Sequence, residues 1–158
     1  MHVTAYDPYV DDDIFELLGI ERRYEFNEFL ATADVVTIHS PLTDETYHMF
    51  DKNALELMKE DAIIVNTARG AIIDRVALEN ALDAGSIGGA GIDVLEIEPP
   101  QGDEPLLNHP RAIVTPHIAW YSEESHNQNM LDGMDELTRA LTGKRPRYVV
   151  NPQIFARR

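Results

Sequence analysis

Five apolar segments of strand length, separated by helical patterns, constrain the fold of this chain more than any other feature. The segments are rich in β-branched residues and are continuously apolar: HVTAYD (2–7), ADVVTIHS (33–40), AIIVNTA (62–68), GAGIDVL (89–95) and RAIVTPH (111–117). Such runs are typical of parallel strands that are buried on both faces of a sheet. Because strands and helices alternate, the sequence predicts an α/β fold with a mostly parallel sheet.

Helix-start and helix-stop signals lie between and after these strands. Asp51 and Asp74 are expected N-caps, and Gly85 is expected to end the helix that begins after Asp74. A last helix is expected to start near Ser122 and to end before Gly143. One face of this last helix is apolar, with Met130, Met134, Leu137 and Leu141.

Composition excludes several classes of function. The chain of 158 residues is 44% hydrophobic, which is typical of a globular protein with one core. Its formal charge of −15 argues against contact with nucleic acid or an anionic membrane, and no apolar run approaches the ~20 residues that span a bilayer. The sequence has no cysteine, no visible signal peptide and no metal-binding spacing among its histidines, so we expect a cytoplasmic protein without a metal site.

Polar residues that interrupt the apolar pattern stand at the C-terminal ends of the predicted strands. They are Asp7, His39, Ser40, Asn66, Thr67, Arg69, Asp93 and His117. In open α/β sheets this edge is where ligands bind. Because polar residues at all five strand ends are improbable by chance, this pattern favours a functional site.

Arg69 lies in the segment VNTARGAIID, between a strand and a helix N-cap. Its planar guanidinium could bind a carboxylate through two parallel hydrogen bonds. The alternative is a loop arginine in a surface ion pair, which is the commoner situation for an arbitrary arginine. The residues alone leave both interpretations open.

His117 and the acidic residues of GIDVLEIEPP could form an acid/base pair. An acid close to a strand-end histidine would fix its tautomer and stabilise its protonated form. The residues do not choose between Glu96 and Glu98 as that acid, and in so acidic a chain both could be solvated charges. Taken together, Arg69, His117 and an acid supply what reduction of a 2-keto acid by hydride requires.

Four segments resemble successive signatures of the D-isomer-specific 2-hydroxyacid dehydrogenases. They are ADVVTIHSPLTDETYHMF, VNTARGAIID, GAGIDVLEIEPP and TPHIAWYSEES. The last is similar to the branch that includes the C-terminal binding protein corepressors. The resemblance runs from about residue 1 to about residue 152 and implies a Rossmann-type, doubly wound parallel sheet with NAD as cofactor.

The resemblance also implies roles for individual residues. Arg69 would hold the substrate carboxylate, His117 would donate the proton, and Glu98 would pair with His117. The residues implied to bind the cofactor are Asp7 at the ribose, Ser40, Pro41 and Thr46, Thr67 and Ala68, Asp93 at the nicotinamide amide, and Trp120 near the nicotinamide.

Against the family pattern, this sheet is expected to be truncated at its N-terminal side. The implied glycine-rich phosphate loop and first strand would precede residue 1, so residues 1–121 would be the C-terminal part of a dinucleotide-binding domain. Residues 122–158 would be a helix and tail that lead back to a substrate domain. The implied activity is NAD-dependent interconversion of a 2-hydroxy acid and a 2-keto acid, with a homodimer in the full-length protein. The alternatives are a corepressor-type NAD-sensing binding protein and an inactive remnant of the dehydrogenase.

Overall fold

All five predicted strands are present in the structure, a computed structural model that describes residues 1–157. They are β1 (Thr4–Tyr6), β3 (Val35–Ile38), β4 (Ile63–Asn66), β5 (Gly89–Ile92) and β6 (Ala112–Val114). A further strand, β2 (Glu21–Arg23), was not predicted. Its three residues are all charged, so it carries no apolar signal.

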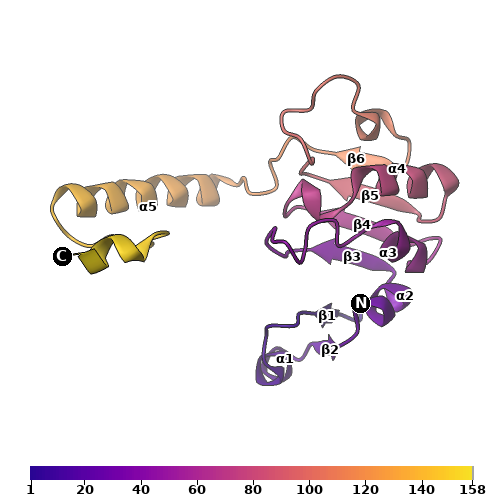
Figure 1. Cartoon of the computed structure of the whole chain (residues 1–158), viewed down its shortest axis with the longest axis horizontal. Helices are drawn as coiled ribbons and strands as arrows, with labels where there is room; N and C mark the ends of the chain where they lie inside the picture. The colour runs from indigo at the N-terminus through magenta and orange to yellow at the C-terminus, as the bar shows by residue number, and fades with distance from the viewer. Residues whose placement is uncertain (158) are drawn as a thin grey trace. The chain divides into compact units, whose positions relative to one another are not determined.

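The strands form two parallel sheets (Figure 1). The larger sheet has the order β3-β4-β5-β6, with Val36 opposite Ile64 and Ile64 opposite Ala90. The smaller sheet pairs β1 with β2, so that Tyr6 lies opposite Arg23. The predicted parallel α/β architecture is therefore confirmed.

Five α-helices connect or follow the strands: α1 (Asp12–Leu18), α2 (Phe26–Thr32), α3 (Lys52–Leu57), α4 (Arg75–Ala84) and α5 (Glu123–Leu141). Three short 3₁₀ helices complete the described elements: η1 (Gly70–Ile72), η2 (Pro105–Asn108) and η3 (Pro152–Arg157). The predicted N-caps at Asp51 and Asp74, the predicted helix end at Gly85 and the expected start of the last helix near Ser122 are confirmed. Asp51, Asp74 and Ser122 each accept a backbone N–H of the first turn, and Gly85 ends α4 with a φ of 71°.

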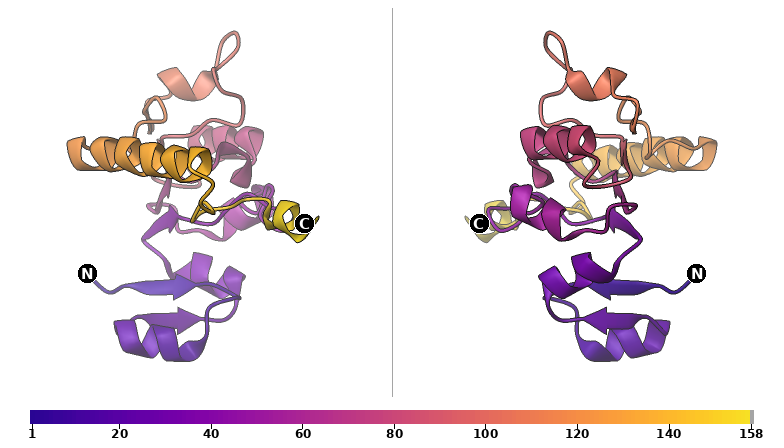
Figure 2. Two further views of the ribbon diagram at one scale, coloured as in Figure 1. Left: turned by 90° about the vertical axis from the view of Figure 1, so that its left-hand side faces the viewer. Right: turned by 90° about the vertical axis from the view of Figure 1, so that its right-hand side faces the viewer.

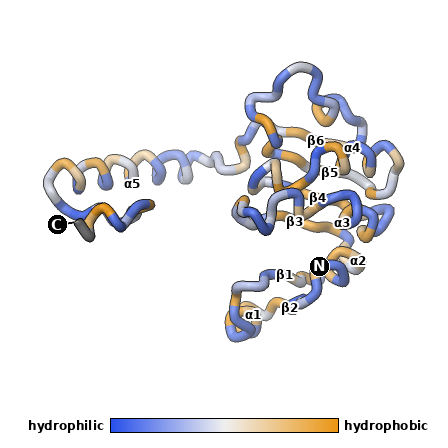
Figure 3. The backbone as a smooth tube through the Cα atoms, in the orientation of Figure 1, coloured by the Kyte–Doolittle hydropathy of each residue, from blue (hydrophilic) through white to orange (hydrophobic). Residues whose placement is uncertain are grey.

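The hydrophobic core lies between one face of the larger sheet and helices α2, α3 and α4 (Figure 2). Its fully buried side chains include Leu30, Leu55, Leu78, Ile64 and Val36. The strands of the larger sheet include hydrophobic stretches, drawn orange in Figure 3.

The expectation that the strands are buried on both faces holds for β5 but not for β3 and β4. Side chains alternate between the two faces of a strand, and in β3 and β4 only one set is fully buried. On the other face Val35, Ile63 and Ile113 are 57%, 43% and 75% exposed. The apolar segments therefore contain more hydrophobic side chains than the described residues of this chain bury.

Aromatic side chains join the smaller sheet to the core of the larger one. The ring of Phe26, at the start of α2, lies 5.4 Å from the Tyr6 ring of β1 and 5.4 Å from the Phe50 ring. Phe50 is 4% exposed and belongs to the core. Tilted and edge-to-face ring pairs of this kind add to the stability given by their burial.

The chain divides into two compact units, Met1–Ala119 and Trp120–Arg158. The second unit contains α5, whose apolar side chains are exposed; Met130 and Met134 are each 59% exposed. Arg139 closes the end of this helix by donating two hydrogen bonds to the Arg145 carbonyl. Within residues 1–157, no helix is both long enough and apolar enough to span a membrane.

Candidate active site

His117 and Glu98 form a direct contact at the predicted ligand-binding edge. The distance from His117 Nδ1 to Glu98 Oε2 is 2.7 Å, and the two side chains are 46% and 34% exposed. The second carboxylate oxygen of Glu98 accepts the Leu95 N–H at 2.8 Å. Glu98 is thus held at both oxygens, and Glu98, not Glu96, is the acid that contacts His117.

Asp93 holds the loop that carries His117. Its side chain is buried and accepts hydrogen bonds from the Thr115 hydroxyl, the Ile118 N–H and the Ala119 N–H. The His117 N–H donates to the Asp93 carbonyl at 2.9 Å, and His117 itself has a φ of 53°. A positive φ is uncommon for a residue other than glycine, so these contacts fix a loop conformation that the chain would not adopt alone.

The same contacts set the ionisation of Asp93. Burial by itself would raise the pKa of the Asp93 carboxyl group, because it disfavours the charged form. The three hydrogen bonds, with a favourable charge interaction from His117, outweigh burial, so the pKa lies below its ordinary value of 3.8. Asp93 is therefore a buried anion at neutral pH.

Arg69 lies at the end of β4 in an exposed loop. Its Nη1 donates to the Ala68 carbonyl at 2.6 Å. Within the described residues no carboxylate lies within 4.0 Å of its guanidinium, so the surface ion pair considered as the alternative is not formed there. Thr67 is exposed and Ala68 half-buried in the same loop.

Asn66 is the buried support of this loop, and it was not among the predicted site residues. It is 1% exposed; its amide donates to the Arg69 carbonyl at 2.9 Å and accepts the Ala68 N–H at 3.0 Å. Its position among the polar strand ends was the available signal. The side-chain amide replaces the backbone partners that β4 loses where it ends.

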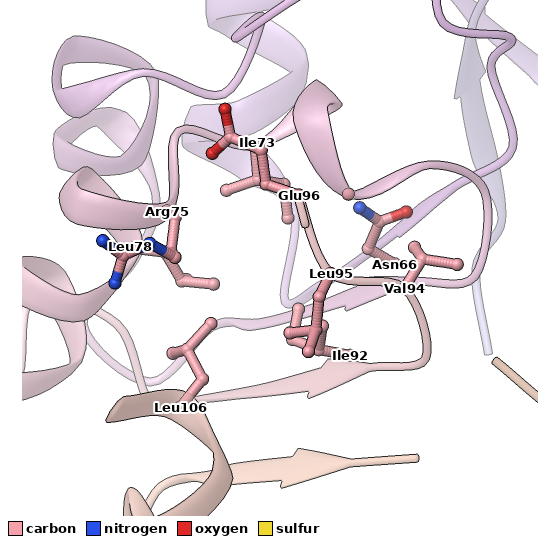
Figure 4. Close-up of a pocket in the computed structure, with 10 residues that line it drawn as sticks. Asn66, Ile73, Arg75, Leu78, Ile92, Val94, Leu95, Glu96 and Leu106 are labelled. Atoms are coloured by element: carbon pink, nitrogen blue, oxygen red, sulfur yellow. The ribbon is translucent and has the colours of Figure 1, made fainter. Parts of the chain in front are cut away.

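The Arg69 loop and the Glu98 loop touch through Gly70. A Cβ atom at Gly70 would lie 2.1 Å from the Leu95 carbonyl carbon and 2.4 Å from the Glu96 nitrogen. Figure 4 shows a small pocket beside this contact, with Asn66 and Ile92 in its wall. Neither Arg69 nor His117 lines this pocket.

Three other predicted residues belong to one turn after β3. Ser40 and Pro41 are exposed, and the Thr46 hydroxyl donates to the Pro41 carbonyl at 2.6 Å. Thr46 Oγ1 also accepts the Thr43 N–H at 2.8 Å. The turn therefore keeps its shape through its own side chains.

Asp7 follows β1, and its surroundings include a cation that the sequence did not reveal. The Asp7 carboxylate accepts the Tyr9 N–H at 2.8 Å, and the Asp7 carbonyl accepts Nη2 of Arg22 at 3.0 Å. Arg22 is committed elsewhere, because it binds Asp12 at 2.6 Å and lies over the Phe15 ring. Fifteen residues separate Asp7 from Arg22, so only the β1–β2 pairing brings them together.

Trp120 belongs to the second unit, whereas the other predicted site residues belong to the first. Its ring makes an edge-to-face contact with Tyr121, with centroids 5.6 Å apart, and its carbonyl accepts the Ser125 hydroxyl. No group of three or more metal-binding side chains occurs within residues 1–157.

The chain is similar in sequence to a known family and to known enzymes. The family described as "D-isomer specific 2-hydroxyacid dehydrogenase, NAD binding domain" matches residues 1–119. D-3-phosphoglycerate dehydrogenase of Methanocaldococcus jannaschii is 40% identical over 96% of this chain and 29% of its own length. Glyoxylate reductase of Korarchaeum cryptofilum is 38% identical over 98% of this chain and 46% of its own length.

A solved structure agrees with these sequence matches. D-lactate dehydrogenase with NAD⁺ from Lactobacillus jensenii aligns with a TM-score of 0.81 and 30% identity, over 94% of this chain and 48% of that one. The chain thus spans less than half of each of these three relatives. On the match over 119 residues, it belongs to the D-isomer-specific 2-hydroxyacid dehydrogenase family, within its NAD-binding domain.

Proposed function

We propose that this chain carries the catalytic residues and part of the NAD site of an enzyme that interconverts a 2-hydroxy acid and a 2-keto acid. The contact between His117 Nδ1 and Glu98 is the observation that carries the proposal. It joins a histidine to a carboxylate at the edge where Arg69 also lies. None of the observations favours a corepressor-type binding protein.

Residues at the carboxyl ends of strands in both sheets offer groups that suit the cofactor. Asp7 offers a carboxylate for ribose hydroxyl groups. The turn at Ser40, Pro41 and Thr46 and the loop at Thr67 and Ala68 offer hydroxyl and backbone groups at the carboxyl ends of adjacent parallel strands. When bound, NADH supplies the hydride that adds to C2 of the keto acid.

The chain's own residues perform the remaining steps. Arg69 binds the substrate carboxylate through two parallel hydrogen bonds and orients the keto group. Glu98 occupies Nδ1 of His117, so the proton passes from Nε2 to the keto oxygen, which becomes the hydroxyl of the product. Glu98 fixes the orientation of the ring, and Asp93 holds the loop in place.

A fused protein tests this proposal. This chain would replace the matching segment of the Korarchaeum glyoxylate reductase, whose remaining part supplies what the chain does not cover. We expect NADH-dependent reduction of glyoxylate or of the 2-keto acids that correspond to D-lactate and D-3-phosphoglycerate. The fusion with His117→Asn is the control for background activity. A folded fusion that binds NADH and reduces none of these acids would contradict the proposal.

A further inference from the structure

We infer that His48 is a positioning residue for this site. By binding Glu96, it holds the loop that carries Glu98 against the loop that carries Arg69. The inference rests on the proposed function for the roles of Glu98 and Arg69, but its contacts are independent of that function.

His48 stands between two carboxylates from different segments. Its Nε2 lies 3.0 Å from Glu96 Oε1, and its Nδ1 lies 3.9 Å from Asp74 Oδ2. The side chains of His48 and Glu96 are each 28% exposed, so the pair is shielded more than an ordinary surface pair. The Tyr47 ring stacks on the His48 ring with centroids 4.0 Å apart and limits its rotation.

The backbone ties His48 to the segment that follows Arg69. The His48 N–H donates to the Ala71 carbonyl at 2.9 Å, and the Phe50 N–H donates to the Ile72 carbonyl at 3.1 Å. His48 has a φ of 50°, which is unfavourable for a residue with a Cβ atom. Such a conformation persists where the surrounding contacts over-determine it, and it marks this position as a constrained junction.

From Glu96, the connection continues to the proposed catalytic pair. Glu96 directly follows Leu95, whose N–H binds Glu98 Oε1. The same two residues lie against Gly70, beside Arg69. A shift of Glu96 therefore moves the Leu95 N–H that orients Glu98, and it loosens the contact that sets the distance between the two loops.

An ordinary exposed ion pair is the competing interpretation, and it predicts a different outcome. Exposed pairs contribute little to stability, so on this interpretation the loss of the His48–Glu96 contact leaves Leu95 and His117 unchanged. His2 and Glu21 form such a pair at 2.7 Å, with side chains 73% and 46% exposed. They provide a matched histidine–glutamate control on the smaller sheet.

The experiment uses the 158-residue chain and NMR. His48→Asn removes the reach to Glu96 and suits the backbone, because asparagine tolerates positive φ better than most residues. We expect amide hydrogen exchange of Leu95 to rise about tenfold or more, as in local opening, and the His117 ring nitrogen signals to shift. Glu96→Gln, which keeps the shape of the side chain, should change the same signals in the same direction by less.

The controls separate positioning from general stability. His2→Asn should leave Leu95 and His117 unchanged, and the core amides of Val36 and Ile64 should keep their protection in every variant. Unchanged Leu95 exchange in His48→Asn overturns the inference, as does an equal rise in core exchange, which shows only loss of stability. Because these signals need neither cofactor nor turnover, an inactive fusion would contradict the proposed function without affecting this result.

Discussion

Arg69 is exposed in its loop, and the only hydrogen bond described for its guanidinium goes to the neighbouring Ala68 carbonyl. We predict that Arg69→Lys lowers kcat/KM of the fused enzyme for 2-keto acids by about tenfold to a hundredfold, because lysine keeps the charge and loses the two-pronged geometry. Arg111→Lys is the matched control, because Arg111 precedes the first residue of β6, whereas Arg69 follows the end of β4. A lower melting temperature with an unchanged specific rate would mean that Arg69 is structural.

The contribution of Asp93 to the stability of the fold depends on pH. Because the pKa of this carboxyl group is lower in the folded chain than its ordinary 3.8, the ionised form stabilises the fold above that value. The stabilisation is lost as the pH falls through the lowered pKa. Asp93→Asn places an N–H₂ group where an acceptor is needed and should lower the free energy of unfolding at pH 7 by about 1–3 kcal/mol.

Urea unfolding followed by circular dichroism measures this difference. The gap between Asp93→Asn and the unchanged chain should narrow as the pH falls below 3.8. Asp11→Asn, at an exposed helix cap without a side-chain hydrogen bond, is the control. A gap of constant size down to the lowest pH would show that the charge of Asp93 does not contribute.

Cofactor choice depends on Asp7 and its neighbour Arg22. The Asp7 carboxylate would accept hydrogen bonds from a free 2′-hydroxyl and repel a 2′-phosphate. The nearby Arg22 does not reverse this preference, because its guanidinium binds Asp12 and lies over aromatic rings. We predict that the fused enzyme uses NADH with a kcat/KM at least about tenfold above that for NADPH, and that Asp7→Ser reduces this ratio. Equal kcat/KM values for the two cofactors in the unchanged fusion would contradict the prediction.

At the scale of elements, the sequence predicted what depends on local pattern. Strand runs and caps at Asp51, Asp74 and Ser122 are local, and each was found where expected. Helices α1 and α2 were missed because neither begins at a residue whose side chain caps the first turn, and α2 depends on packing such as the ring contacts of Phe26. Strand β2 was missed because its three residues are charged. Family resemblance, not periodicity, separated Glu98 from Glu96, because side-chain partners depend on where a loop folds.

The contact of two loops at Gly70 is the element-scale feature most sensitive to change. We predict that Gly70→Ala lowers the free energy of unfolding by at least about 2 kcal/mol, because the added methyl group meets backbone atoms that cannot rotate away. Gly91→Ala on β5 is the control, since its Cβ would lie 3.6 Å from Val65 at ordinary contact distance. Urea unfolding of both variants should show a loss only for Gly70→Ala. If Gly70→Ala were as stable as Gly91→Ala, the Arg69 loop and the Glu98 loop would be free to move apart.

In the whole molecule, the described strands form two separate sheets, and no strand of one sheet pairs with a strand of the other. Within the described residues β1 pairs only with β2, and β3 pairs only with β4. Each therefore has a backbone edge without a strand partner, and the exposed face of the larger sheet adds apolar side chains such as Val35 and Ile113. Unpaired edges and exposed apolar faces favour association with other chains.

These features predict how the 158-residue chain behaves on its own. The pyrophosphate of a dinucleotide binds at a glycine-rich turn and a helix N-terminus, and the described residues, 1–157, contain no glycine-rich turn that follows a strand and opens a helix. We therefore expect no NAD⁺ binding in the micromolar range by calorimetry, and a mass that rises with concentration in light scattering. The fusion supplies the matched control, because its additional segments should restore binding and reduce the association. A soluble monomer of the chain that binds NAD⁺ at micromolar concentration would show that the residues at Asp7, Ser40 and Thr46 suffice to hold the cofactor without a phosphate loop.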